Sequence, residues 1–202
     1  MPENQYFAES PEGKLVLREI TVSLCGEKVN VVTAGGVFSP EHIDQGTQVL
    51  LNHLSSAKPS GTFLDIGCGW GAIALSLALQ SPKAIVYAID VNERSLELTK
   101  INADRLNLKN IIICKPDEVP KDLLFDEIWS NPPIRVGKEA LHGILKLWLN
   151  RLARGSCARL VVQKHLGADS LQKWLETNFE SDFETTRVET SKGFRLLKVC
   201  RN

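Results

Sequence analysis

The sequence predicts an α/β fold: a doubly wound, mostly parallel sheet of seven strands with an antiparallel edge strand, preceded by an N-terminal β-hairpin. Three observations predict it. Apolar β-type runs alternate with segments of helical periodicity through most of the 202 residues, which is typical of a parallel sheet covered by helices. A glycine-rich turn joins the first of these runs to its helix. Two final stretches, 185–189 and 194–199, are close enough to pair as antiparallel strands.

The elements follow one another in a regular order. Apolar and polar residues alternate over 15–24, the chain turns at Cys25-Gly26-Glu27, and an apolar return through Val32 predicts the N-terminal hairpin. A short helix is expected at 49–54. Further strands are expected at 62–66, 84–89, 110–114, 126–129 and 158–162. Helices are expected at 72–80, at 93–106, at 138–152 (ended by Arg154-Gly155), and through Trp174 and Leu175 with Asp169 or Ser170 as the cap.

Composition and charge are those of an ordinary globular protein. Hydrophobic residues make up 43% of the chain, and 24 basic residues balance 24 acidic ones, so nucleic-acid binding would need a local basic patch. Five cysteines without a C-x-x-C pair predict reduced, buried thiols, and four scattered histidines predict no metal site.

Length and hydropathy predict a single domain, with residues 1–35 as a hairpin extension and 36–202 as the core. Residues 1–10 are polar and acidic, which argues against a signal peptide. The most apolar stretch, 71–79, is too short to span a bilayer. We therefore expect a cytoplasmic protein without a membrane partner.

The glycine-rich turn predicts a ligand site. Asp65 ends the first core strand, where doubly wound sheets bind ligands, and Gly67, Gly69 and Gly71 let the backbone approach a ligand closely. The following helix offers free N–H groups at its positive end. The same residues fit the loose dinucleotide fingerprint or a simple tight turn, so this motif alone leaves three interpretations open.

Two further acids favour a nucleoside-type cofactor. Asp90 ends the second core strand, where a carboxylate accepts hydrogen bonds from both ribose hydroxyls, although it could also cap the next helix. Asp117 follows the third strand and could accept a hydrogen bond from an adenine amine.

Asn131-Pro132-Pro133-Ile134 follows the fourth core strand and indicates the chemistry. The prolines stiffen the loop and remove N–H donors, leaving the Asn131 side-chain oxygen and the Pro132 carbonyl as acceptors. Two convergent acceptors suit a planar –NH2 group, whose lone pair they would turn toward an electrophilic methyl group. The alternative is that these residues only end the strand and have no catalytic function.

These motifs together resemble the class I S-adenosylmethionine-dependent methyltransferases that act on exocyclic or amide nitrogens. With Gly36-Val37-Phe38-Ser39 and Asp44-Gln45-Gly46-Thr47, the chain resembles the small-domain family that includes the bacterial ribosomal RNA small-subunit methyltransferase C, a guanine-N2 methyltransferase. The resemblance implies S-adenosylmethionine as cofactor, ribosomal RNA or the small subunit as partner, and a monomer. One position departs from the family: Ile134 replaces an aromatic residue that stacks on the target base, a role that Phe38 or Trp129 could take.

The resemblance also implies roles for single residues. The catalytic residues would be Asn131, Pro132, Pro133 and Ile134. The cofactor-binding residues would be Gly46, Thr47, Asp65, Gly67, Cys68, Gly69, Gly71, Asp90, Val91, Asp117 and Asn131. The substrate-binding residues would be Phe38, Arg135, Lys138, Lys164, Lys192 and Arg195.

The substrate stays open between several classes. If the basic residues converge on one rim, they would bind RNA phosphates, but scattered solvated charges are the alternative. The acceptor pair would serve a protein glutamine, a DNA adenine or a small-molecule amine equally well. A third possibility is a non-catalytic module that binds cofactor or RNA.

Overall fold

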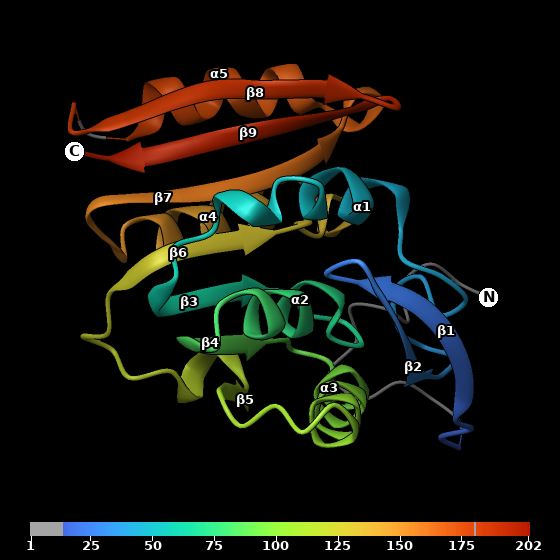
Figure 1. Ribbon diagram of the computed structural model, residues 1–202. Helices are drawn as coiled ribbons and strands as arrows, with labels where there is room; N and C mark the ends of the chain where they lie inside the picture. Colours follow the sequence, from blue (N-terminus) through green and yellow to red (C-terminus); the bar gives the residue numbers. More distant parts are fainter. Residues whose placement is uncertain (1–13, 180) are drawn as a thin grey trace.

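A seven-stranded sheet forms the centre of the computed structural model, which describes residues 14–179 and 181–202 (Figure 1). Its strands are β3 (Ser60–Ile66), β4 (Lys83–Ile89), β5 (Ile111–Cys114), β6 (Phe125–Ser130), β7 (Leu152–Gln163), β8 (Phe183–Ser191) and β9 (Phe194–Arg201). Their order is β5-β4-β3-β6-β7-β9-β8, and only β9 runs against the others. The predicted mostly parallel sheet with a closing hairpin is confirmed. The expectation for residues 1–10 lies outside the described residues.

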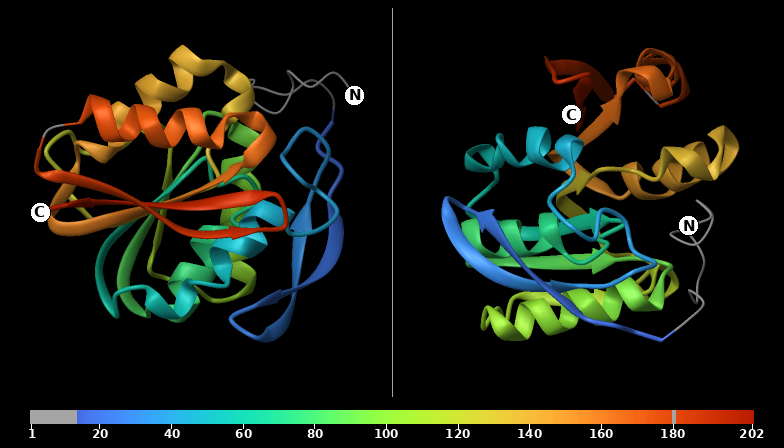
Figure 2. Two further views of the ribbon diagram at one scale, coloured as in Figure 1. Left: turned by 90° about the horizontal axis from the view of Figure 1, so that it is seen from above. Right: turned by 90° about the vertical axis from the view of Figure 1, so that its right-hand side faces the viewer.

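Helices cover both faces of this sheet, as the left-hand view of Figure 2 shows. They are α1 (Gln45–Leu51), α2 (Ala72–Gln80), α3 (Glu93–Arg105), α4 (Lys138–Leu149) and α5 (Ala168–Asn178). On one face, α1 and α2 bury side chains such as Leu77 against Phe63. On the other, α4 and α5 bury side chains such as Leu145 against Leu64. Successive strand residues point to opposite faces, so neighbours on β3 belong to different layers.

The predicted N-terminal hairpin forms a separate two-stranded sheet, β1 (Arg18–Leu24) and β2 (Glu27–Thr33). It packs on α2 and α3, where Leu24 and Val31 share a buried cluster with Leu75 and Leu98. Asn102 on α3 fixes this contact: its amide oxygen accepts from Val32 N at 2.7 Å, and its amide nitrogen donates to Val32 O at 2.9 Å. The same nitrogen also donates to the Trp70 carbonyl at 2.9 Å. The hairpin is thereby joined to the glycine-rich turn.

The short helix expected at 49–54 forms earlier in the chain, as Gln45–Leu51, and two further predicted boundaries are wrong. The helix expected at 138–152 ends at Leu149, and Arg154-Gly155 lies inside β7 rather than in a helix break. β7 pairs with β6 through a register shift, which the positive φ of Gly155 (73°) accommodates. The second error concerns α5, which begins after Gly167 without a side-chain cap among the described residues. Asp169 instead forms an ion pair with Arg187 at 2.9 Å.

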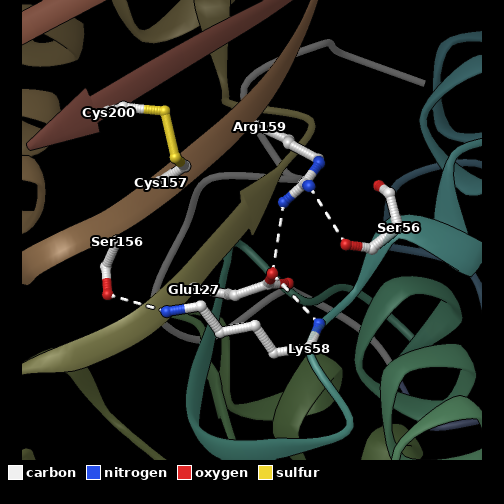
Figure 3. Close-up of a disulfide and its surroundings, with 7 residues drawn as sticks. All are labelled: Ser56, Lys58, Glu127, Ser156, Cys157, Arg159 and Cys200. Atoms are coloured by element: carbon white, nitrogen blue, oxygen red, sulfur yellow. Dashed lines mark hydrogen bonds and ion pairs between the residues drawn. A yellow bond between two sulfur atoms is a disulfide. The ribbon is translucent and has the colours of Figure 1, made fainter.

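The expectation of five reduced thiols is also wrong, because Cys157 and Cys200 form a disulfide (Figure 3). The two residues face each other directly in the antiparallel register of β7 and β9. Residues 43 positions apart carry no sequence signal of such pairing, since it depends on the sheet register. Cys25, Cys68 and Cys114 are free, and of these only Cys68 is buried.

Candidate active site

The predicted site residues gather at the carboxyl edge of the sheet. β3, β4 and β6 are neighbours and run in parallel, so their ends meet at this edge. Asp65 lies at the end of β3, Asp90 directly follows β4, and Asn131 directly follows β6. Asp117 lies beyond the end of β5, in the exposed 3-10 turn Pro116–Glu118.

The loop from Gly67 to Gly71 presents bare backbone at this edge. Gly67 and Gly69 have φ values of 74° and 58°, and a Cβ on either would meet no described atom within 4 Å. The N–H groups of Gly67 and Cys68 donate to the Ile89 carbonyl at 2.9 and 3.0 Å, which holds the loop against β4. Open space beside left-handed glycines suits close approach of a ligand. The fit supports a bound cofactor rather than a turn made only for folding.

Gly71 has a different function in the same loop. It is the N-cap of α2 with a φ of 100°, and a Cβ there would lie 3.1–3.2 Å from Thr99 and Leu75. Close packing of the loop on α3 therefore requires a glycine at this position. The Thr99 hydroxyl donates to the Gly69 carbonyl at 3.0 Å and fixes the loop from the same side.

Asp65 is a fully buried carboxyl group with one unused oxygen. Its Oδ2 accepts from Ala74 N at 3.0 Å, whereas its Oδ1 has no hydrogen-bond partner in the described part of the chain. The pKa of Asp65 is raised to about 8, chiefly by burial; the hydrogen bond from Ala74 opposes this shift, and the Asp90 carboxylate adds to it. A buried acceptor without a partner is costly, and a donor from a bound ligand would offset that cost.

Asp90 links the glycine loop to the start of α3. Its Oδ2 accepts from Gly69 N at 3.0 Å, and its Oδ1 accepts from Asn92 N at 2.9 Å. Burial raises the pKa of Asp90, while the hydrogen bonds from Asn92 and Gly69 lower it. Hydrogen bonds from Ser95 and Val91 also lower its pKa, so several donors of the chain hold this carboxylate in place. Val91, the next residue, exposes 48% of its surface beside this carboxylate.

Asn131 is oriented by two contacts from the start of α1. Its amide nitrogen donates to Asp44 Oδ2 at 2.9 Å and to Thr47 Oγ1 at 3.1 Å. The Pro132 carbonyl, predicted as the second acceptor, already accepts from Ile134 N at 2.8 Å and keeps one lone pair. Ile134 begins a 3-10 turn (Ile134–Val136) and is partly buried against the core, together with Val136.

One cavity joins three of these parts. Its lining combines the glycine loop, the start of α1 and the residue after β6: Phe38, Ser39, Asp44, Thr47, Gly67, Cys68, Gly69, Trp70, Ala72, Ile73 and Asn131. The lining does not include Asp65, Gly71, Asp90, Val91 or Asp117. Gly46 is buried at the start of α1, beside the cavity-lining Thr47.

No sequence pattern assigned a function to Asp44, Ser39 or Trp70. Trp70 Nε1 donates to the Ser39 carbonyl at 3.2 Å, so the two residues close one wall together. A signal for Asp44 existed: an aspartate directly before a short helix is a typical N-cap, and its side chain accepts from Gly46 N and Thr47 N. Its contact with Asn131 had no such signal.

The two aromatic candidates for stacking on a base lie in different environments. Trp129 is fully buried, its indole nitrogen donates to Glu127 at 2.7 Å, and Arg159 covers its ring at 4.7 Å. Figure 3 shows Arg159 and Glu127 in this interior network. Phe38 exposes 48% of its surface at the cavity. Phe38, and not Trp129, is therefore available to contact a substrate.

The five basic residues expected on one rim do not all reach the surface. Lys164 and Lys192 are exposed and close in space, because Lys164 N donates at 2.8 Å to the carbonyl of Gly193. Arg135 and Lys138 are exposed beyond Asn131 at the same sheet edge. Arg195 is 7% exposed and forms an ion pair with Asp169, whose own side chain is exposed. Arg195 is therefore not part of the basic surface.

A second, larger cavity of about 610 Å³ lies between the hairpin turn, α1 and α2. Lys192 and His42 are its basic lining residues, and none of the residues that line it is acidic. Gln48 of α1 lines this cavity, whereas its neighbour Thr47 lines the smaller one. Among residues 14–179 and 181–202, no group of three or more His, Cys, Asp or Glu could hold a metal ion. None of the described helices combines the length and the hydropathy needed to cross a bilayer.

Comparison with known families and proteins agrees with this geometry. The family model described as methyltransferase small domain matches residues 28–198. A Bacillus subtilis protein named uncharacterized protein YbxB is 33% identical over 197 residues, covering 96% of both chains. The ribosomal RNA small subunit methyltransferase C of Acinetobacter baumannii is 30% identical over 200 residues, covering 91% of this chain and 55% of that protein. The chain thus spans nearly all of the first relative and about half of the second.

Solved structures show the same architecture. A T. thermophilus 16S rRNA N2 methyltransferase, solved with AdoMet and guanosine, has a TM-score of 0.79 and 24% identity over 95% of this chain and 52% of that one. A ribosomal protein L11 methylase from Lactobacillus delbrueckii has a TM-score of 0.66 and 20% identity over 90% of this chain and 98% of that one. The fold alone is common to enzymes with different substrates.

Proposed function

Since this chain belongs to the methyltransferase small-domain family, we propose that it methylates a planar amine, namely N2 of a guanine in small-subunit ribosomal RNA. Its reaction class is methyl transfer and its cofactor is S-adenosylmethionine. The guanine acceptor is inferred from the relatives named ribosomal RNA small subunit methyltransferase C, of which this chain spans about half.

The residues at the carboxyl edge fit the cofactor. We assign its amino-acid end to the glycine loop and to the unused oxygen of Asp65, with Gly46 and Thr47 beside it. Asp90 would accept from the ribose hydroxyls, and Asp117 would accept from the adenine amine. When bound there, S-adenosylmethionine supplies a methyl group that is electrophilic because it is bonded to a sulfonium sulfur.

Asn131 and Pro132 prepare the nucleophile. The Asn131 side-chain oxygen and the remaining lone pair of the Pro132 carbonyl each accept one hydrogen of the target amine. The nitrogen lone pair would thereby be drawn out of conjugation and directed toward the methyl group that the cofactor would supply. The nitrogen then loses one proton to solvent. Catalysis consists of orientation and electrostatic stabilisation.

The observation that carries this proposal is the meeting of Asn131 with the glycine loop in one cavity. A strand end without chemistry would not need an amide held beside bare glycine backbone. Phe38 offers an exposed ring at the same cavity. This ring takes the place of the family's aromatic residue, which is Ile134 in this chain. Lys164 and Lys192 supply positive charge for RNA phosphates at the same sheet edge.

The test is transfer of a labelled methyl group from S-adenosylmethionine to defined acceptors. Ribosomal RNA, small subunits and ribosomal proteins are purified from a strain that lacks the gene, so that the acceptor positions are unmodified. We expect label in small-subunit RNA, recovered as N2-methylguanosine, and transfer by Asn131→Ala that is about 100- to 1000-fold slower. Label in protein, or in another base, would replace the guanine acceptor while keeping the reaction class.

A further inference from the structure

Asp44 is fixed by its own helix before it reaches the site. It precedes α1, and its Oδ2 accepts from Gly46 N at 2.8 Å and from Thr47 N at 3.1 Å. This is an N-cap arrangement, which satisfies two N–H groups that have no partner within the helix. The carboxylate therefore has a defined position relative to α1.

The same oxygen also accepts from a residue 87 positions away. Asn131 Nδ2 donates to Asp44 Oδ2 at 2.9 Å and to Thr47 Oγ1 at 3.1 Å. An ionised carboxylate can only accept hydrogen bonds, so only the –NH2 end of the Asn131 amide can face it. Both hydrogens of that end have a partner, and the oxygen end must point away from Asp44.

We propose that Asp44 is a positioning residue for methyl transfer, which fixes the side-chain amide of Asn131 so that its oxygen faces the target amine. This inference rests on the proposed function of Asn131. The negative charge has a second effect, because a donor bound to a carboxylate polarises its amide and makes the oxygen a stronger acceptor. Thr47 secures the second amide hydrogen and keeps the amide from rotating.

The competing interpretation is that Asp44 only caps α1. Asp44→Ser separates the two, because serine is an equally good N-cap but is too short to reach Asn131. If Asp44 positions Asn131, the turnover rate of Asp44→Ser falls about 10- to 100-fold, the range expected when a reacting group is misplaced. The affinity for S-adenosylhomocysteine and the melting temperature stay near those of the parent. Asp44→Asn keeps both the cap and an acceptor oxygen, and restores most of the rate.

A double-mutant cycle shows whether Asp44 acts through Asn131. In an Asn131→Ala background, Asp44→Ser has no amide left to position, so we expect it to lower the residual rate no further. Equal losses in both backgrounds would overturn the proposal. So would an Asp44→Ser enzyme that turns over as fast as the parent.

A readout without a methyl acceptor keeps this test separate from that of the proposed function. In a ¹H–¹⁵N spectrum, the Asn131 side-chain amide is assigned by its loss in Asn131→Ala. We expect its hydrogen-bonded protons to shift in Asp44→Ser, and an unchanged signal would overturn the Asp44 contact. If the parent protein methylates no RNA, the proposed substrate fails, while the amide signal still decides whether Asp44 orients Asn131.

Discussion

The ring of Phe194 packs directly against the backbone of Gly46: a Cβ atom on Gly46 would lie 2.7 Å from Cε1 of that ring. Cβ atoms in proteins essentially never approach another heavy atom within 3.0 Å, so this position admits no larger side chain without movement. The contact connects the first residue of β9 with the first turn of α1, which carries Thr47. Packing therefore fixes the end of α1 that faces the candidate site.

Gly46→Ala tests this contact. We expect the free energy of unfolding to fall by about 1–3 kcal/mol, because an added methyl group overpacks the site. Displacement of α1 should also weaken binding of S-adenosylhomocysteine. Gly143→Ala is the matched control: it lies inside α4, a Cβ there meets no described atom within 4 Å, and we expect a gain of about 0.5–1 kcal/mol. Urea unfolding measures both, and a Gly46→Ala protein as stable as the parent would contradict the prediction.

Asn131→Ala should affect the rate far more than the cofactor. The Asn131 oxygen binds an amine hydrogen most strongly as the nitrogen becomes tetrahedral, so its loss raises the barrier of the chemical step. By analogy with an oxyanion-hole donor, we expect the single-turnover rate to fall about 100- to 1000-fold. Asn131→Asp keeps an acceptor and should retain part of the activity. If the melting temperature and the cofactor affinity fall together with the rate, Asn131 fixes the conformation of the loop and does not bind the target amine.

Asp90→Ala should weaken cofactor binding by about 1–3 kcal/mol, because it removes two acceptors and leaves the Gly69 N–H without a partner. Asp117→Ala provides the comparison. Asp117 is exposed, so the loss of its hydrogen bond should cost no more than about 1 kcal/mol. Calorimetric titration with S-adenosylhomocysteine measures both, and an unchanged dissociation constant for Asp90→Ala would remove Asp90 from the site.

The stability of the ligand-free protein should depend on pH through Asp65. The pKa of Asp65 in the folded protein is about 8, whereas an unfolded aspartate titrates near 4. Between these values the folded state holds a proton that the unfolded state lacks, so its stability falls as pH rises. The slope from this one group approaches about 1.4 kcal/mol per pH unit. Asp65→Asn cannot titrate, and urea unfolding at pH 5, 6, 7 and 8 should show the parent losing stability relative to this variant. Parallel curves would contradict the raised pKa.

Lys164→Gln and Lys192→Gln should weaken RNA binding and flatten its dependence on salt. Each removed phosphate contact lowers the slope of log affinity against log salt by about 0.7 for a single strand. Lys146→Gln is the control, since this exposed lysine lies in the last turn of α4, away from the carboxyl edge. Filter binding at several salt concentrations measures the slopes. Equal slopes for all three variants would mean that these lysines do not face RNA.

Much of the fold was predictable because its signals are local. Apolar runs such as 84–89 and the amphipathic stretch 93–105 form the strand and helix that their patterns predict. The first part of β7 was missed because its pairing with β6 depends on a register shift that no pattern within residues 152–156 encodes. Asp65 and Asn131 were identifiable as candidates because each closes a strand. The contact of Asn131 with Asp44 was not, since it depends on how α1 packs beside the sheet.

The Cys157–Cys200 bond makes a covalent ring of the chain segment that holds α5, β8 and the turn at Lys192. A protease that cuts the exposed backbone after Lys192 would therefore release no fragment until the bond is reduced. β9, which carries Phe194 against Gly46, would stay attached to β7 through the disulfide. Its high effective concentration would keep it bound in its original position in the sheet. Nicked molecules should run as intact chains on non-reducing gels and separate into two bands only after a thiol is added.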